Sequence, residues 1–163
     1  MISPEQWLGQ LLQTETSQPH EWPFVAWVVR NRVEARGFPD DYEGVILERR
    51  QFSFYNDLSG TPEEVFEQAG QRYPVKADAF ACAVAVIGAA RWEAPFGASV
   101  CHHYSPRSTV PAGRGPAWAW SILRPFTPAG IDSWRFVFAE SVPRSHPGAG
   151  PPGPAVRPGM LRS

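Results

Sequence analysis

Apolar side chains recur at helical spacing through the first half of the chain, and this period predicts four helices. They cover residues 3–15, 23–36, 61–73 and 76–91. The last of them is rich in alanine and the most apolar, which predicts a central buried helix. Residues 38–60 are expected to be mostly loop, with a shorter candidate helix at 42–49.

Two of the predicted helices begin with the same local signal. Ser3 and Thr61 are each followed by a proline and, three residues on, by Gln6 and Glu64. A hydroxyl and a carboxamide or carboxylate at this spacing satisfy the free N–H groups at the start of a helix, and proline fits the first turn. Gly37 is expected to end the second helix.

The pattern changes after Pro95. Residues 99–104 and 135–142 are rich in β-branched and aromatic side chains and predict short strands, separated by a stretch rich in Pro, Gly and Trp. Residues 143–163 are dominated by Pro and Gly and predict an extended or disordered tail. We therefore expect an α+β, mainly α, domain over residues 1–142 with a small β element.

Composition narrows the function classes. With 43% hydrophobic and 19% charged residues, the 163-residue chain is typical of a globular protein, and its net charge of −1 argues against nucleic acid as a partner. The apolar runs are too short to span a bilayer, and residues 1–4 show no secretory signal. The two cysteines, Cys82 and Cys101, favour free thiols over a disulfide framework.

One carboxylate continues an apolar stripe. Leu8, Leu11, Leu12 and Glu15 fall at i, i+3, i+4 and i+7 and share one helix face. A carboxyl group there is partly desolvated, and desolvation favours the protonated form. A protonated glutamic acid is the group that glycoside cleavage requires. The alternative is an exposed glutamate at a helix end.

A metal site is not expected. His102 and His103 lie beside Cys101, and His20 lies elsewhere, but neither an H-E-x-x-H nor a paired C-x-x-C spacing is present. Neighbouring residues on a strand also point to opposite faces. We expect no metal and no cofactor.

Several segments, in order, carry a resemblance to a family. They are Thr14-Glu15, Glu21, the helix 25–33 (VAWVVRNRV), Phe38-Pro39, Gly44-Val45-Ile46 and 51–54 (QFSF), followed by 79–88, 100–104 and Pro116-Ala117-Trp118. Together they resemble the SleB-like cell-wall hydrolases, which comprise spore-cortex-lytic enzymes and their bacterial and phage relatives. The resemblance covers about residues 5–140.

The resemblance implies a lysozyme-like fold and cleavage between N-acetylmuramic acid and N-acetylglucosamine in peptidoglycan. The family's catalytic acid falls on Glu15. The sequence departs from the family in two places: Glu15 and Glu21 are six residues apart, further than in the family's E-A-x-G-E, and residues 130–138 lack the histidine of its terminal G-x-H-x-F-Y element.

Two mechanisms are consistent with the resemblance. A lytic transglycosylase uses one glutamate, which protonates the glycosidic oxygen and then accepts the proton of the muramoyl C6 hydroxyl. A hydrolytic muramidase needs a second carboxylate, for which Glu21 and Asp57 are candidates. We favour the transglycosylase.

Further residues are candidates for substrate binding, each with a purely structural alternative: Glu21, Phe52, Ser53, Tyr104 and Trp118. For Asn31 and Arg32 we favour structural hydrogen bonds.

Rival functions are a zinc amidase or peptidase and a non-catalytic peptidoglycan-binding or virion structural protein. The expected partner is the peptidoglycan glycan strand. Phage virion or tail proteins are further candidates, since the enzyme would act at the cell wall or periplasm without a visible signal peptide.

Overall fold

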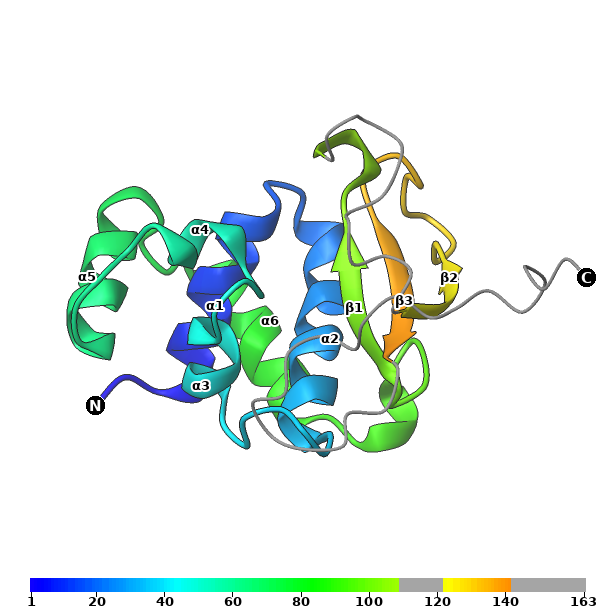
Figure 1. Cartoon of the computed structure of the whole chain (residues 1–163), viewed down its shortest axis with the longest axis horizontal. Coiled ribbons are helices and arrows are strands. Elements are labelled where there is room, and N and C mark those ends of the chain that lie inside the picture. Colours follow the sequence, from blue (N-terminus) through cyan, green and yellow to red (C-terminus); the bar gives the residue numbers. More distant parts are fainter. Residues whose placement is uncertain (109–121, 142–163) are drawn as a thin grey trace, which may run out of the picture.

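The computed structural model describes residues 1–108 and 122–141, and within them a group of helices packs beside a small antiparallel sheet (Figure 1). The α-helices are α1 (Pro4–Glu15), α2 (Trp22–Glu34), α3 (Tyr42–Leu47), α4 (Ser53–Asn56), α5 (Pro62–Arg72) and α6 (Ala77–Gly88). Short 3-10 turns are η1 (Pro19–Glu21), η2 (Arg91–Glu93) and η3 (Pro106–Ser108). The strands are β1 (Val100–Tyr104), β2 (Ile122–Phe126) and β3 (Val137–Ser141).

The predicted caps form. The Ser3 hydroxyl accepts from the Gln6 backbone N–H at 3.2 Å, and the Gln6 side chain accepts from the Ser3 N–H at 2.9 Å. Thr61 and Glu64 make the same reciprocal pair at the start of α5. Because each cap uses only residues within one turn, the sequence predicted these helix starts closely.

The core lies where α1, α2 and α6 meet, and α2 also packs against β1. α1 and α6 approach closely at Gly9, where an added Cβ would come within 3.2 Å of Val75 and 3.3 Å of the Phe80 backbone. α2 buries an almost continuous run, from Val25 to Val29, because it has the other helices on one side and the sheet on the other.

α6 differs from its prediction as a central buried helix. It buries Ala79, Ala83 and Val86 against the core. Its other side is exposed to solvent, although apart from Asp78 that side is also apolar: Ala77, Phe80, Ala81, Val84, Ala85 and Gly88. The prediction was wrong on this face. Four of the six apolar residues are alanine or glycine, whose exposure costs little free energy because they carry little apolar area, but Phe80 and Val84 are also 38% and 46% exposed.

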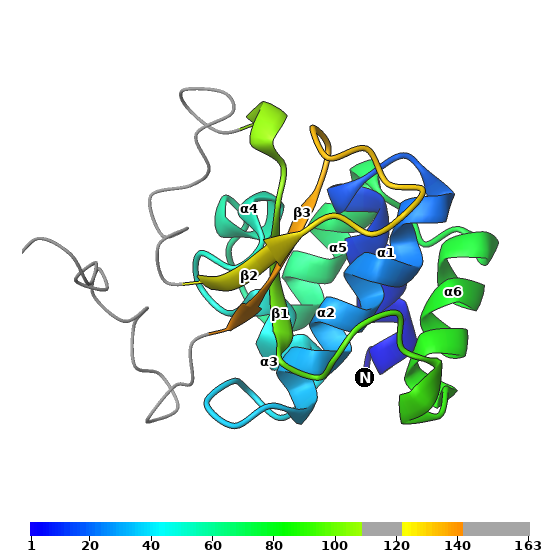
Figure 2. The ribbon, with the colours of Figure 1, turned by 90° about the vertical axis from the view of Figure 1, so that its right-hand side faces the viewer.

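The sheet has the strand order β1–β3–β2 within the described residues, and both pairings are antiparallel (Figure 2). β1 and β3 agree with the predicted strands, but β2 was not predicted. It contains Pro125, Arg124 has a positive φ of 47°, and the β2–β3 register shifts between Leu123 and Phe126. β2 pairs on one side only in this order, and an edge strand tolerates proline.

One smaller difference concerns a helix, whereas the cysteines agree with their prediction. The segment predicted as loop after residue 49 contains the short helix α4. Cys82 and Cys101 are not joined by a disulfide, and burial raises the pKa of the Cys82 thiol to about 11.

Some expectations fall outside the described residues. They are the tail at 143–163, with the domain boundary that it sets, and the Pro116-Ala117-Trp118 element. Across residues 1–108 and 122–141, none of the helices combines the length and hydrophobicity that a membrane crossing requires.

Candidate active site

Glu15 is the last residue of α1 and lies at the edge of a cleft. Leu8, Leu11 and Leu12, which precede it on the same face, are fully buried, as the helical phase predicted. The Glu15 side chain is 17% exposed. The helix face that is buried at the three leucines therefore reaches solvent at Glu15, where α1 ends.

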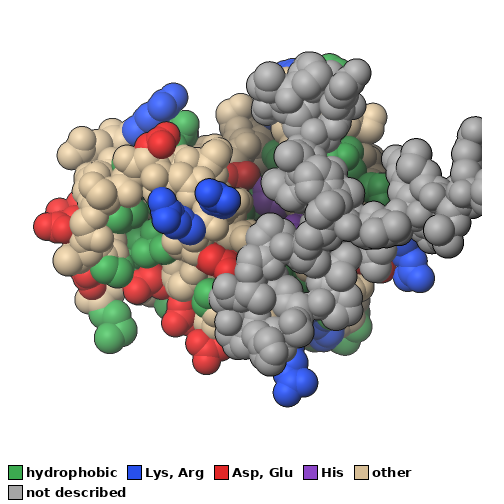
Figure 3. All heavy atoms as spheres, viewed as in Figure 1, with side chains coloured by type: hydrophobic (Ala, Val, Ile, Leu, Met, Phe, Trp, Pro, Cys, Tyr) green, Lys and Arg blue, Asp and Glu red, His purple; other side chains and the backbone are tan. Residues whose placement is uncertain are grey.

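The cleft has a volume of about 420 Å³, within the usual range for small-molecule sites. It lies between the end of α1, the segment around α4, strand β1 and the residue before β3. Its lining residues are Thr14, Glu15, Arg50, Gln51, Ser53, Asn56, His103, Tyr104, Ser105 and Phe136. Figure 3 shows histidine on this face, with acidic and basic side chains to one side of it. Among the described lining residues, Glu15 is the only carboxylate.

His103 is the hydrogen-bond partner of Glu15. Its Nε2 lies 2.9 Å from the Glu15 Oε2, and its side chain is 5% exposed. The two residues are 88 positions apart and come from β1 and α1. The sequence drew attention to His103 only as a metal ligand, and no local pattern connects it with Glu15.

Arg50 supplies a cation at the cleft and has a strained backbone. Its φ is 66°, in the left-handed region that residues other than glycine rarely adopt. Its backbone N–H donates to Oδ1 of Asn56 at 2.9 Å. The hydrogen bond to Asn56 helps to hold Arg50 in this conformation at the cleft.

Glu21 lies in a different environment from the one its predicted role in substrate binding requires. It is 1% exposed, and Arg135 donates to both of its oxygens at 2.8–3.2 Å. Thr16 also donates to Glu21, at 2.6 Å. Burial raises the pKa of Glu21, but the hydrogen bonds of Arg135 and Thr16 and the charge of Arg135 bring it below its usual value. Glu21 is thus an anion in a buried ion pair and does not line the cleft.

Of the other residues predicted to bind substrate, two line the cleft and one lies in the core. Ser53 and Tyr104 line the cleft with Glu15. Phe52 is 1% exposed and packs in the core, with the Arg32 guanidinium 5.1 Å from its ring centre and the His103 ring centre at 6.1 Å. It therefore supports the cleft from behind. Trp118 lies outside the described residues.

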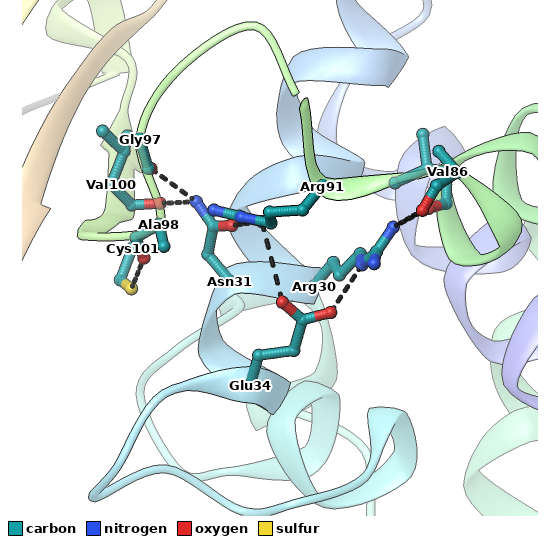
Figure 4. Close-up of polar contacts among 10 residues, drawn as sticks. Arg30, Asn31, Glu34, Val86, Arg91, Gly97, Ala98, Val100 and Cys101 are labelled. Atoms are coloured by element: carbon teal, nitrogen blue, oxygen red, sulfur yellow. Dashed lines mark hydrogen bonds and ion pairs between the residues drawn. The ribbon is translucent and has the colours of Figure 1, made fainter. Parts of the chain in front are cut away.

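Asn31 and Arg32 hold the helices to the sheet. Asn31 donates to the carbonyls of Gly97 and Val100, at 3.1 and 2.8 Å, and Arg32 donates to the Cys101 carbonyl at 2.6 Å. Figure 4 shows Asn31 reaching from α2 toward the start of β1, while Arg30 points toward the end of α6. These contacts agree with the structural role favoured for Asn31 and Arg32.

The adjacent histidines separate as strand neighbours do. His102 Nε2 lies 2.9 Å from the Ser141 hydroxyl, whereas His103 faces Glu15. In the part of the chain that the structure describes, no three His, Cys, Asp or Glu side chains are grouped as metal ligands.

The fold and the cleft together define a class: a mainly helical, lysozyme-like domain with a three-stranded sheet and a glutamate at the edge of a cleft. A family model for cell wall hydrolases matches residues 20–136, which is more than half of the chain. The chain therefore belongs to the cell wall hydrolase family, and the resemblance found in the sequence is confirmed. The matched range includes Glu21 and His103 but begins after Glu15.

A solved structure agrees with this fold. The catalytic domain of the germination-specific lytic transglycosylase SleB from Bacillus anthracis matches with a TM-score of 0.58 and 21% sequence identity. The match covers 84% of this chain and 93% of that chain. At this identity the similarity establishes the fold. No curated protein sequence matches the chain.

Proposed function

We propose that this protein is a lytic transglycosylase that cleaves peptidoglycan between N-acetylmuramic acid and N-acetylglucosamine, with Glu15 as its catalytic acid and base. Membership of the cell wall hydrolase family supports an enzyme that acts on peptidoglycan. The fold that it shares with the catalytic domain of the lytic transglycosylase SleB supports the finer assignment.

One observation carries the choice of mechanism: the described lining of the cleft holds a single carboxylate, Glu15. A hydrolytic glycosidase of the usual kind uses two carboxyl groups on either side of the bond. The two candidates for the second, Glu21 and Asp57, do not line the cleft. Glu21 is in addition committed to Arg135.

A single glutamate can complete the transglycosylase reaction. The Glu15 carboxyl group gives its proton to the glycosidic oxygen as the bond from the muramoyl C1 to that oxygen breaks. The C6 hydroxyl oxygen of the same sugar then bonds to C1, and its proton passes to the Glu15 carboxylate. The acid is regenerated, no water is consumed, and the product ends in a 1,6-anhydro ring.

The test compares wild type with E15Q on purified sacculi by zymography. Glutamine keeps the shape of the side chain but cannot donate an acidic proton, so we expect activity to fall by about 100- to 10,000-fold. D57N is the matched control, because Asp57 is an exposed carboxylate outside the cleft, and it should retain full activity. Clearing by E15Q at the wild-type rate would disprove the assignment of Glu15.

Mass spectrometry of the digested glycan separates the two mechanisms. Anhydro ends on the muramoyl sugars are expected for the transglycosylase. Reducing ends would instead identify a hydrolytic muramidase with the same catalytic acid. Retained activity of E15Q together with inhibition by a chelator would identify the amidase alternative.

The proposed site of action is the cell wall or periplasm, with glycan strands as the partner. An association with phage virion or tail proteins stays a prediction. Binding of the purified protein to sacculi without cleavage would favour the non-catalytic alternative.

A further inference from the structure

His103 is the one described residue that forms a hydrogen bond with the Glu15 carboxyl group. The bond joins the Nε2 and Oε2 atoms at 2.9 Å, and both side chains are largely buried. A buried hydrogen bond to a carboxylate is stronger than one in water, because little solvent competes with it. The proposed acid therefore has a fixed partner on a different element of the fold.

The His103 ring is held in place by aromatic side chains. The ring centres of Phe136, Phe138 and Phe52 lie 5.7, 6.0 and 6.1 Å from its own. Phe136 and Phe138 come from β3 and its approach, and Phe52 directly precedes α4. With three rings around it, the imidazole has little room to rotate away from Glu15.

The second ring nitrogen indicates which tautomer is present. Nδ1 of His103 is buried and has no hydrogen-bond partner within the described part of the chain. A neutral imidazole carries its proton on one nitrogen and a lone pair on the other. A buried N–H without an acceptor is costly, so the proton belongs on Nε2, where the Glu15 carboxylate accepts it.

We propose that His103 is a positioning residue for Glu15: its Nε2–H donates to Oε2 and leaves Oε1 as the oxygen that gives and takes the proton in the cleft. This inference rests on the proposed function. In the reaction, His103 keeps its proton throughout, because the proton in transit moves between Oε1 and the sugar oxygens. The hydrogen bond also stabilises the Glu15 anion that exists after the first step.

Other titratable and charged groups surround the pair. Arg50, in the segment before α4, and Tyr104, next to His103 on β1, line the same cleft. On β3 and directly before it, the described side chains in ring contact with His103 are the uncharged Phe138 and Phe136. Arg50 is thus the charged side chain nearest the pair among the described cleft residues. We expect a substitution of His103 to change activity through its hydrogen bond to Glu15.

The test compares H103L with H103Q, which retains an N–H donor of similar reach, and uses H102Q as the matched control on the other face of β1. Release of soluble fragments is measured at several sacculus concentrations. We expect H103L to lower kcat by about 10- to 100-fold, as expected when a reacting group is misplaced, with KM within about threefold. H103Q should recover most of this loss, and H102Q should match wild type.

Rescue by the conservative variant distinguishes positioning from a structural role. A structural role would lower the fraction of folded protein, whereas positioning lowers kcat per folded molecule in H103L and restores it in H103Q. Equal losses of kcat per folded molecule in both variants would overturn the proposal.

A measurement on the wild-type protein covers the case in which H103L does not fold. Nitrogen-15 NMR of the His103 ring reports which nitrogen carries a proton at neutral pH. A proton on Nε2, with or without one on Nδ1, supports the inference, and a proton on Nδ1 alone overturns it. No substrate is involved, so this failure is distinct from failure of the proposed function, which full activity of E15Q would reveal.

Discussion

Glu15 and Glu21 lie six residues apart on either side of the end of α1, yet the fold gives them opposite environments. Glu15 is 17% exposed beside a cleft, and its hydrogen-bond partner among the described residues is His103. Glu21 is 1% exposed and is bound by a guanidinium and a hydroxyl. A carboxyl group that must exchange a proton needs access to substrate, whereas one that holds elements together needs a permanent counter-ion.

The comparison also shows how the buried pair is connected to the two sides of the cleft. Thr16 follows Glu15 directly and contributes its hydroxyl to the Glu21–Arg135 pair. Arg135 lies just before β3, which carries the aromatic ring contacts to His103. The buried pair therefore fixes the end of α1 against the sheet, and in this way it fixes the distance between Glu15 and His103 without contacting substrate.

The largest effect on stability is expected from R135M. The change leaves the buried Glu21 carboxylate without its counter-ion, which typically costs about 3–5 kcal/mol of unfolding free energy. Urea unfolding followed by circular dichroism measures it. The double variant E21Q/R135M should be more stable than R135M alone, because the uncompensated charge is gone. If R135M unfolds at the wild-type urea concentration, the pair has no structural role.

A smaller loss of unfolding free energy is expected from N31A. This variant tests whether a buried, uncharged residue is also structural and not catalytic. Asn31 is 1% exposed, donates to two backbone carbonyls and accepts from Arg91 at 2.7 Å. Removal of these bonds should cost about 1–3 kcal/mol. The N31A protein that remains folded should still cleave peptidoglycan, since Asn31 does not line the cleft. Loss of activity without loss of stability would place Asn31 at the substrate instead.

The smallest expected effect is a difference in acid stability between wild type and E21Q. The pKa of Glu21 is lowered in the folded state, so its contribution to stability is fully present above the ordinary glutamate pKa of about 4.3 and is lost as pH falls through the folded value. Unfolding midpoints measured from pH 7 to pH 3 should therefore fall more steeply for wild type than for E21Q. Parallel curves would show that Glu21 is not held as an anion.

The E15Q variant tests the other carboxylate of the comparison, Glu15. Its main effect should be on catalysis, with a change in unfolding free energy of only about 1 kcal/mol, because the glutamine oxygen can still accept the hydrogen bond of His103. A large destabilisation of E15Q would contradict the view that the two carboxylates have separate roles.

Local sequence signals determined much of the helical half. The caps at Ser3 and Thr61 depend on contacts three residues apart, and the helical period depends on the spacing of side chains along a single helix. Both are properties of a short segment and can be read from it. The same local reasoning placed Glu15 on the face of the buried leucines, and the structure agrees.

The tertiary structure alone decided which partners each site residue has. His103 lies 88 residues from Glu15, and Arg135 lies 114 residues from Glu21. β2, with its proline and positive φ, has a strand conformation only because β3 supplies its hydrogen bonds. Pairings of this kind depend on how distant segments pack, and no local spacing encodes them. The sequence thus determined that Glu15 stands at the end of an apolar stripe, and the packing of β1 on α2 decided that a histidine lies within hydrogen-bond distance of it.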